Sequence, residues 1–390
     1  MLSRTRNAQN YLRTKTGSAI YRTLLSATSF LSFQPKRLLS SRWKPLWTLV
    51  PKLDLDHNSI SSHIVYSVLA QHAAPILRNF THSWNSPCDT SHFDEWIDIA
   101  IARNVQHLDL YIVCGQLFEF PHTAFHCKTL VALEFSGRIE LDPPPSFQLP
   151  SIKILGLYEI YYKSDNSLSS LCSGCPNLED LAVVNDFVIG PVIVNSKISL
   201  PFLKRLRIDF LSFQPEPLDY RLEIYAPVLE CFQFFGSLSN VVFLEKLAHL
   251  NEAHFNVYVC IGLGYIYPSM FQNLVRLNFK VTQSNWHVLQ SLLVVAPNLE
   301  VLVLDKHYYH KSQLCWMEPP DGSGYLLGST ELEHEVEFIK YILKEAIVLK
   351  IITIKVSAQH SKESVLKKLS MFPRHSTTCL LTVEIDNPME

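Results

Sequence analysis

The sequence of 390 residues is poor in charged side chains, in glycine and in long apolar runs, and each shortage excludes a class of protein. Charged residues make up 18% against 47% hydrophobic residues, a balance that excludes an intrinsically disordered chain. The longest apolar runs fall far short of the roughly 18 residues that a transmembrane helix needs, so no membrane partner is expected. With only 12 glycines, the chain has little with which to build a phosphate-binding loop.

The nine cysteines lack the spacing of a disulfide framework and indicate reduced intracellular thiols. The only close pair is Cys172-x-x-Cys175, and a structural zinc site needs two further ligands at suitable spacing. We therefore expect buried apolar packing there, with no metal and no cofactor. His307-x-x-His310 falls in an expected loop and is interpreted as a solvated pair. Gly262-Leu263-Gly264 is too short for a nucleotide-binding motif, and we expect no enzyme activity.

Charge is distributed unevenly along the chain. Residues 1–52 hold ten Lys or Arg and no Asp or Glu, which leaves 24 basic and 36 acidic residues in the remainder. This composition is typical of an organellar transit peptide, but we favour the alternative of a basic segment left over from a normal domain. Residues 1–35 are expected to form a poorly ordered basic leader. The rest of the chain shows no recurring Lys/Arg-rich face, so nucleic acid is not an expected partner.

A six-residue pattern recurs along most of the sequence and is clearest at Leu299 to Leu304, which follows Ala-Pro-Asn. Apolar residues occupy its first, fourth and sixth places, the spacing of a short strand with one buried face. Steps of 21 to 28 residues separate successive matches, within the period of leucine-rich repeats. The predicted fold is α/β, a curved leucine-rich-repeat solenoid of about eleven irregular repeats over residues 50–306. The first residues of the matches are Val50, Leu77, Val105, Leu130, Ile152, Leu178, Leu203, Leu229, Leu250, Leu274 and Leu299.

Several segments between the expected strands have a helical period, and others are rich in proline. Because a strand and its return cannot bury their apolar faces alone, stacked neighbours must share one core. Asp142-Pro143-Pro144-Pro145 predicts an irregular return. The helical faces are Ile60, Ile64 and Val68; Trp96, Ala100 and Arg103; and Trp286, Leu289 and Leu293.

After Leu304 the repeat pattern breaks, and residues 307–330 have a loop composition. The sequence Thr330-x-x-Glu333 predicts a helix that begins there and ends near Ala346. A strand over Leu349 to Ile354 follows 50 residues after Leu299, which is two periods and suggests one distorted or shortened repeat in between. A helix over Lys362 to Met371 and a strand over Leu380 to Ile385 complete an expected α/β cap at residues 331–390.

Four segments resemble those of plant F-box proteins that carry leucine-rich repeats and a C-terminal FBD domain. Residues 41–56, SRWKPLWTLVPKLDLD, resemble the end of the F-box and its passage into the first strand. The stretch SGCPNLEDL at 173–181 resembles the usual repeat junction. Residues 337–346 and 372–379 resemble the FBD helix and its closing strand. The resemblance covers about residues 38–386.

The resemblance implies a substrate receptor of a Skp–cullin–F-box ubiquitin ligase, in the cytoplasm or nucleus. The F-box would dock the Skp adaptor on a cullin scaffold, and the repeats would hold an unknown target protein. Residues 36–49 correspond to the last part of that F-box, since no Leu-Pro-x-x-x-Leu segment occurs upstream of Leu38. The alternative is a leucine-rich-repeat scaffold without a ligase role. The candidate adaptor-binding residues are Arg42, Trp43, Leu46 and Trp47, and the aromatic cluster has the equal alternative of capping the solenoid.

The third and fifth places of each repeat are expected to face outward on the concave surface, opposite the buried fourth and sixth places. Their charges are mixed in sign, as expected for a protein partner. Arginine is enriched at interfaces and binds carboxylates bidentately. The candidate target-binding residues are Asp180, Arg205, Arg207 and Arg276, and the alternative for each is an ordinary solvated side chain.

Overall fold

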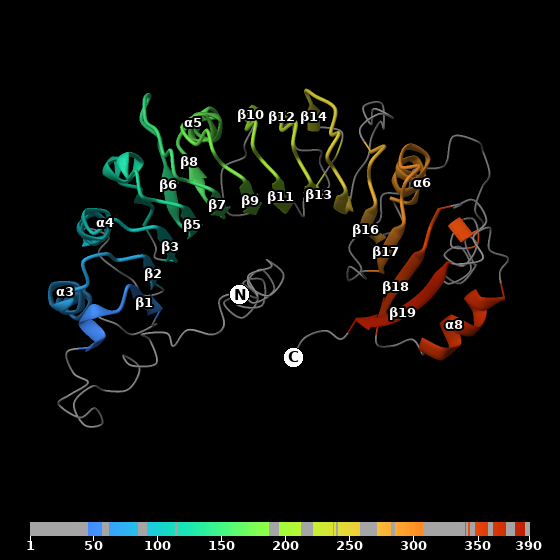
Figure 1. Ribbon diagram of the computed structural model, residues 1–390, viewed down its shortest axis with the longest axis horizontal. Coiled ribbons are helices and arrows are strands. Elements are labelled where there is room, and N and C mark those ends of the chain that lie inside the picture. The colour runs from blue at the N-terminus through green and yellow to red at the C-terminus, as the bar shows by residue number, and fades with distance from the viewer. Residues whose placement is uncertain are drawn as a thin grey trace.

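The computed structural model folds into a curved solenoid with strands along the inside of an arc (Figure 1). Helices and short outer strands cover the other side of these strands. The prediction of a leucine-rich-repeat solenoid is therefore confirmed at the level of its architecture. The structure describes residues 46–56, 62–84, 92–113, 116–186, 195–211, 221–236, 238, 241–257, 271–281, 285–306, 340, 342–343, 348–357, 362–371 and 379–386.

The inner side of the arc is one parallel sheet of thirteen strands in the described part of the chain. Neighbours in the sheet follow one another along the sequence, as stacked repeats require. Each predicted first place lies two residues before a strand of this sheet. The strands are β1 (Lys52–Asp56), β2 (Asn79–Trp84), β3 (His107–Ile112), β5 (Ala132–Gly137), β7 (Ile154–Tyr158), β9 (Asp180–Asp186), β11 (Arg205–Leu211), β13 (Cys231–Gly236), β15 (Glu252–Val257), β16 (Arg276–Val281), β17 (Val301–Lys306), β18 (Ile351–Ser357) and β19 (Leu380–Asp386).

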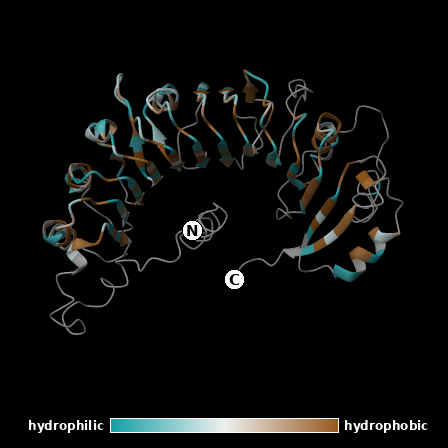
Figure 2. Ribbon diagram, viewed as in Figure 1, coloured by the Kyte–Doolittle hydropathy of each residue, from teal (hydrophilic) through white to brown (hydrophobic). Residues whose placement is uncertain are grey.

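Alternation along each strand sends apolar side chains into the core and the intervening side chains toward the inside of the arc. Figure 2 shows hydrophobic and hydrophilic residues together in these strands. In β17, Leu302 is fully buried and Leu304 is 3% exposed, while Val301 and Val303 are only half-buried. The first places from Leu77 to Leu299 are all buried as well. The apolar pattern of the sequence therefore fixed both the face and the register of these strands.

Successive repeats are joined by side-chain hydrogen bonds at the turns that lead into the strands. The side-chain amide of Asn177 donates to the carbonyl oxygen of Pro150 at 2.9 Å, and that of Asn298 donates to the carbonyl of Gln272 at 2.7 Å. One position before β9, the Glu179 carboxylate pairs with Lys153 at 2.7 Å and Lys204 at 3.0 Å. The two lysines lower the pKa of Glu179 to about 2.

The outer side of the solenoid alternates helices with two small sheets that the sequence did not predict. The sheets are β4 (Phe118–Glu119), β6 (Ile139–Leu141) and β8 (Tyr161–Tyr162), then β10 (Asn195–Ser199), β12 (Arg221–Tyr225) and β14 (Val241–Phe243). The helical segments are η1 (Leu46–Leu49), α3 (Ser62–Gln71), α4 (Phe93–Ala102), η3 (His122–His126), α5 (Ser167–Ser173), α6 (Trp286–Val295) and α8 (Lys362–Ser370).

The three predicted helical faces fall on α3, α4 and α6. Val68, Trp96 and Leu289 are buried against the sheet, whereas Arg103 is the C-cap residue of α4. Residue 60 lies outside the described ranges. The proline-rich return at 142–145 has no regular secondary structure, as predicted.

The C-terminal strands continue the same sheet, and this corrects the prediction of a distorted repeat between Leu304 and Leu349. Val301 in β17 pairs directly with Ile351 in β18, so no other strand separates the two. The predicted final helix and strand correspond to α8 and β19. The predicted helix before them lies mostly outside the described residues, apart from helical Lys340 and residues 342–343.

The N-terminal end of the described solenoid begins with η1. The carbonyl oxygen of Thr48 accepts hydrogen bonds from the amides of Ala73 at 2.7 Å and Ala74 at 2.9 Å, which ties η1 to the end of α3. Of the candidate adaptor-binding residues, Arg42 and Trp43 lie outside the described residues. Leu46 and Trp47 belong to η1.

Candidate functional site

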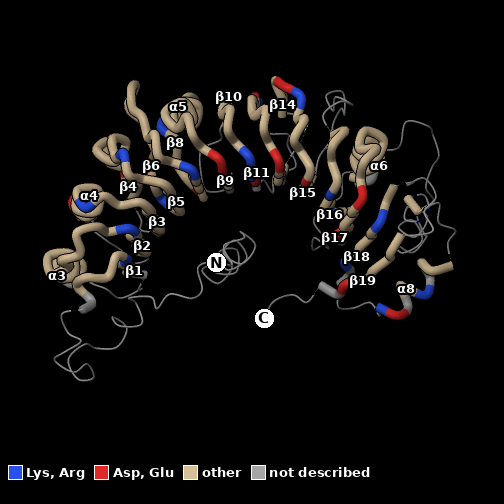
Figure 3. The backbone as a smooth tube through the Cα atoms, viewed as in Figure 1, with Lys and Arg blue, Asp and Glu red and all other residues tan. Residues whose placement is uncertain are grey.

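The inner, concave face of the sheet carries rows of side chains in lateral register. Parallel pairing aligns the first residue of each strand with the first residue of its neighbours. Figure 3 shows residues of both charges in the middle strands of the sheet. One row therefore runs through Asp180, Arg205, Cys231, Glu252 and Arg276.

Charges of opposite sign are adjacent within this row. The Nε atom of Arg205 donates to the Asp180 carboxylate at 2.8 Å. The Nε atom of Arg276 lies 3.8 Å from the Glu252 carboxylate. Both arginine side chains remain about half exposed, at 54% and 49%, so each guanidinium can exchange its partner for a carboxylate of a bound protein.

Arg207 occupies the same face but differs from the two exposed arginines. Its guanidinium pairs with Asp209 two residues further along β11, and the two side chains are only 12% and 10% exposed. Burial raises the pKa of the Asp209 carboxyl group, and the neighbouring guanidinium opposes that rise. Of the four predicted target-binding residues, Arg207 is therefore the least available to a partner.

The N-terminal half of the concave face is acidic and aromatic. Asp109 and Glu134 are lateral neighbours in β3 and β5. The Tyr158 side chain folds back over Gly156, where an added Cβ would come within 2.8 Å of its ring. Burial, followed by the charge of Glu134, raises the pKa of the Tyr158 hydroxyl. This part of the face suits basic or hydrogen-bond-donating groups of a partner.

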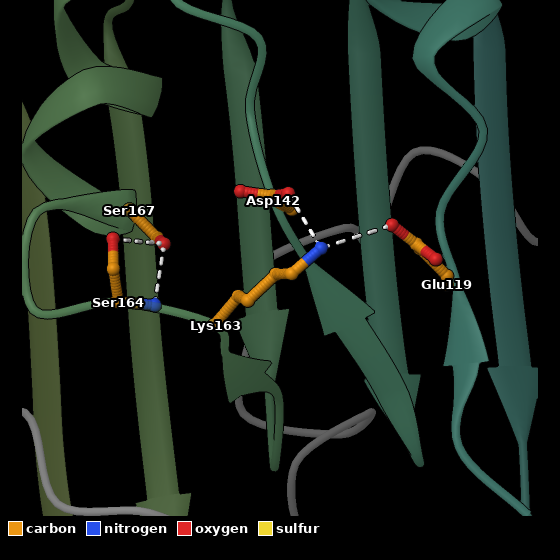
Figure 4. A network of polar contacts seen from close by, with 5 residues as sticks. All are labelled: Glu119, Asp142, Lys163, Ser164 and Ser167. Carbon is orange, nitrogen blue, oxygen red and sulfur yellow. Dashed lines mark hydrogen bonds and ion pairs between the residues drawn. The ribbon is translucent and has the colours of Figure 1, made fainter.

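The outer face carries a different network (Figure 4). The ammonium group of Lys163 lies 2.9 Å from the Asp142 carboxylate and 3.4 Å from that of Glu119. These residues come from the ends of β4, β6 and β8, so one lysine joins three successive repeats. Beside it, the hydroxyl of Ser167 accepts a hydrogen bond from the amide of Ser164 at 3.1 Å.

The cysteine pair predicted to be structural lies in the core. Cys172 is 1% exposed and Cys175 is fully buried. Burial raises the pKa of the Cys175 thiol to about 12, so it is protonated at neutral pH. Residues 262–264 and 307–310 lie outside the described ranges.

Glu252 and His254 occupy the third and fifth places of their repeat but were not among the candidate target-binding residues. Their repeat begins at Leu250 and has Ala253 at its fourth place, so its match to the pattern is weak. Counting the third and fifth places there, as in stronger repeats, would have found both. They matter because Glu252 belongs to the row described above, and the His254 imidazole lies 3.0 Å from its carboxylate.

The curved parallel sheet with a mixed-charge inner face defines a leucine-rich-repeat protein. No described helix is both long and apolar enough to cross a bilayer. Residues 93–200 match a family described as the leucine-rich repeats of FBD-associated F-box protein At5g56370.

Curated relatives extend this similarity to nearly the whole chain. FBD-associated F-box protein At3g52670 of Arabidopsis thaliana is 30% identical over 91% of this chain and 94% of its own length. F-box/FBD/LRR-repeat protein At3g52680 of the same plant is 29% identical over 90% of this chain and 88% of its own length. The chain belongs to the F-box/FBD/leucine-rich-repeat family.

Proposed function

We propose that this chain is the substrate-recognition subunit of a Skp–cullin–F-box ubiquitin ligase, acting in the cytoplasm or nucleus without catalytic residues of its own. Its family membership supports a recognition role of the F-box type. The observation that carries the target-binding half is the row of exposed, exchangeable ion pairs on the concave face, from Asp180 to Arg276.

The proposed organisation follows the expected domains. Residues 36–49 act as the adaptor-binding segment after the leader at 1–35, and about eleven repeats over 50–306 bind the target. Residues 307–330 connect the repeats to an FBD cap at 331–390. The pairing of β18 and β19 with the end of the repeat sheet supports a cap that shields its last apolar face.

The proposed binding of the adaptor is tested with the purified full chain and a purified Skp adaptor. We expect a one-to-one complex on size exclusion, weakened at least tenfold by Trp43→Ala and Trp47→Ala. Lys163→Ala, on the outer face, is the control and should bind like the native chain. Absence of a complex with the native chain rules out the ligase role.

The proposed binding of a target protein is tested separately, by proximity labelling in plant cells followed by binding assays with the recovered proteins. A true target should bind the native chain and lose affinity at least tenfold with Arg205→Glu and Arg276→Glu. Lys163→Glu reverses a charge on the outer face and controls for net charge. A target that binds all three variants equally does not use the concave face.

The second candidate function is a binding scaffold outside any ligase. The row of exposed ion pairs on the concave face favours it, because target binding through that row requires no adaptor. In that case the Arg205 and Arg276 variants still lose the target, while the native chain fails to bind the adaptor. The two assays therefore distinguish the candidates.

A further inference from the structure

Three side chains of metal-binding type meet at the centre of the concave face. Cys231 and Glu252 begin the adjacent strands β13 and β15 and are in lateral register. His254 follows Glu252 by two residues and so projects from the same face. The Sγ atom of Cys231, a carboxylate oxygen of Glu252 and an imidazole nitrogen of His254 all lie within 4.8 Å of one another.

The donor set and its spacing suit zinc. Thiolate, imidazole and carboxylate are the ligands that Zn²⁺ takes in proteins, at bond lengths of about 2.0 to 2.3 Å. A tetrahedral ion therefore holds its ligand atoms roughly 3.3 to 3.8 Å apart. The Nε2 atom of His254 already lies 3.0 Å from the Glu252 carboxylate. Zinc binding therefore requires side-chain rotations that draw the three donors to this spacing.

The charges around the three donors are compatible with a divalent cation. A thiolate and a carboxylate together neutralise Zn²⁺, and the imidazole binds as a neutral ligand. Arg276 lies 3.8 Å from the Glu252 carboxylate, where it can orient the carboxylate from outside the ligand set. Burial raises the pKa of the Cys231 thiol to about 11, with the Glu252 charge adding to the rise.

A second group of three possible metal ligands lies on the outer face, but it is less available to a metal ion. Glu119, His122 and Asp142 also come within 4.8 Å of one another. There, however, the Lys163 ammonium group pairs with both carboxylates, at 3.4 and 2.9 Å. The Lys163 ammonium group already occupies the space between the two carboxylates, so this group serves as an internal comparison.

We propose that Cys231, Glu252 and His254 bind one Zn²⁺ ion on the concave face. Three protein ligands leave a fourth position open, as in zinc sites that exchange ligands. That position faces the surface between Arg205 and Arg276, where it can take water or a donor atom from a bound protein. The site requires neither an adaptor nor a ligase role.

Cobalt provides the direct test, because Co²⁺ substitutes for Zn²⁺ and reports thiolate ligation by absorption. The full chain is treated with chelator, desalted and titrated with Co²⁺ at neutral pH. We expect one Co²⁺ per chain, with a thiolate-to-cobalt absorption band that Zn²⁺ abolishes by displacement. Cys231→Ser should remove the band, and His254→Ala should weaken binding by more than about 100-fold, beyond the usual cost of losing an outer-shell partner.

His122→Ala is the matched control, since it removes a histidine next to two carboxylates on the outer face. It should leave the cobalt titration unchanged. Circular dichroism checks that each variant folds, and Glu252→Gln replaces any variant that does not, because its side chain is 37% exposed. The proposal is overturned if the native chain gives no thiolate band, if the band persists in Cys231→Ser, or if Glu252→Gln binds cobalt with native affinity.

Discussion

The ammonium group of Lys350 donates a 2.6 Å hydrogen bond to the carboxylate of Glu300, fifty positions earlier in the chain. Both residues stand immediately before strands, β18 and β17, that pair in the sheet. Glu179 pairs with Lys153 and Lys204 in the same place of earlier repeats. The C-terminal strands therefore join the repeat array in the same lateral register as the repeats join one another.

Removing this ion pair should cost little stability. Both side chains are well exposed, at 63% and 38%, and exposed pairs contribute about 0 to 1 kcal/mol. We expect Lys350→Met to lower the free energy of unfolding by less than about 1 kcal/mol. Leu302→Ala, at a fully buried position of β17, should cost about 2 to 5 kcal/mol. Urea denaturation measures both, and equal losses would show that the ion pair is essential for docking the last strands.

Substitution of Arg207 should destabilise the protein much more than substitution of Arg205, although the two are only two residues apart. Arg207→Met leaves the buried Asp209 carboxylate without its cation, which should cost about 3 to 5 kcal/mol of stability. Arg205→Met removes an exposed partner of Asp180 and should cost at most about 1 kcal/mol. The double variant Arg207→Met/Asp209→Asn should recover part of the loss. Thermal unfolding of the four proteins checks this, and a stable Arg207→Met variant contradicts it.

Gly137 should not tolerate a side chain. Its φ is +98°, and an added Cβ would overlap the backbone carbonyl of Ile112 in the neighbouring strand. Gly137→Ala should therefore lose more than about 3 kcal/mol, from left-handed strain together with the backbone clash. Gly156→Ala is the control, because its nearest obstacle is the movable Tyr158 side chain at 2.8 Å. Similar midpoints in urea for the two variants would refute the prediction.

His72 should make the first repeats sensitive to acid. Its Nε2 atom lies 2.8 Å from the carbonyl oxygen of Val50, and its Nδ1 atom lies 2.8 Å from the Arg103 guanidinium. If Nε2–H donates to the carbonyl, Nδ1 accepts from Arg103 and the ring is neutral. Burial and, less strongly, the Arg103 charge lower the pKa of His72 below the ordinary value of a histidine, although the bond to Val50 opposes this.

At pH values between the lower folded-state pKa and the unfolded-state pKa, His72 therefore binds a proton in the unfolded chain but not in the folded chain. The stabilisation is fully present above about pH 6.5 and is lost as the pH falls through the lower folded-state pKa. Between about pH 7 and 5, we expect the melting temperature to fall more steeply for the native chain than for His72→Gln. The comparison is with His63→Gln, which removes an exposed histidine of α3, the helix that ends immediately before His72. Parallel pH profiles for the native chain and His72→Gln would contradict this assignment.

Sequence reasoning located the strands well because each repeat presents its own apolar pattern to the core. It missed β4, β6 and β8, since strands of two or three residues are too short to show alternation. It also expected one distorted or shortened repeat between Leu304 and Leu349, because spacing alone cannot distinguish a missing strand from a long connection. Pairing of Val301 with Ile351 resolves this, and that pairing depends on contacts between distant residues.

The sequence by itself determined the solenoid, the register of its strands and the face on which Asp180, Arg205, Arg207 and Arg276 lie. These follow from periodicity, which is a local property. Only the tertiary structure decided which of these charges are paired, which are buried and which donors meet. Arg205 contacts Asp180 across 25 residues of chain, and Cys231 approaches His254 across a strand boundary, because stacking places equivalent positions of successive repeats side by side.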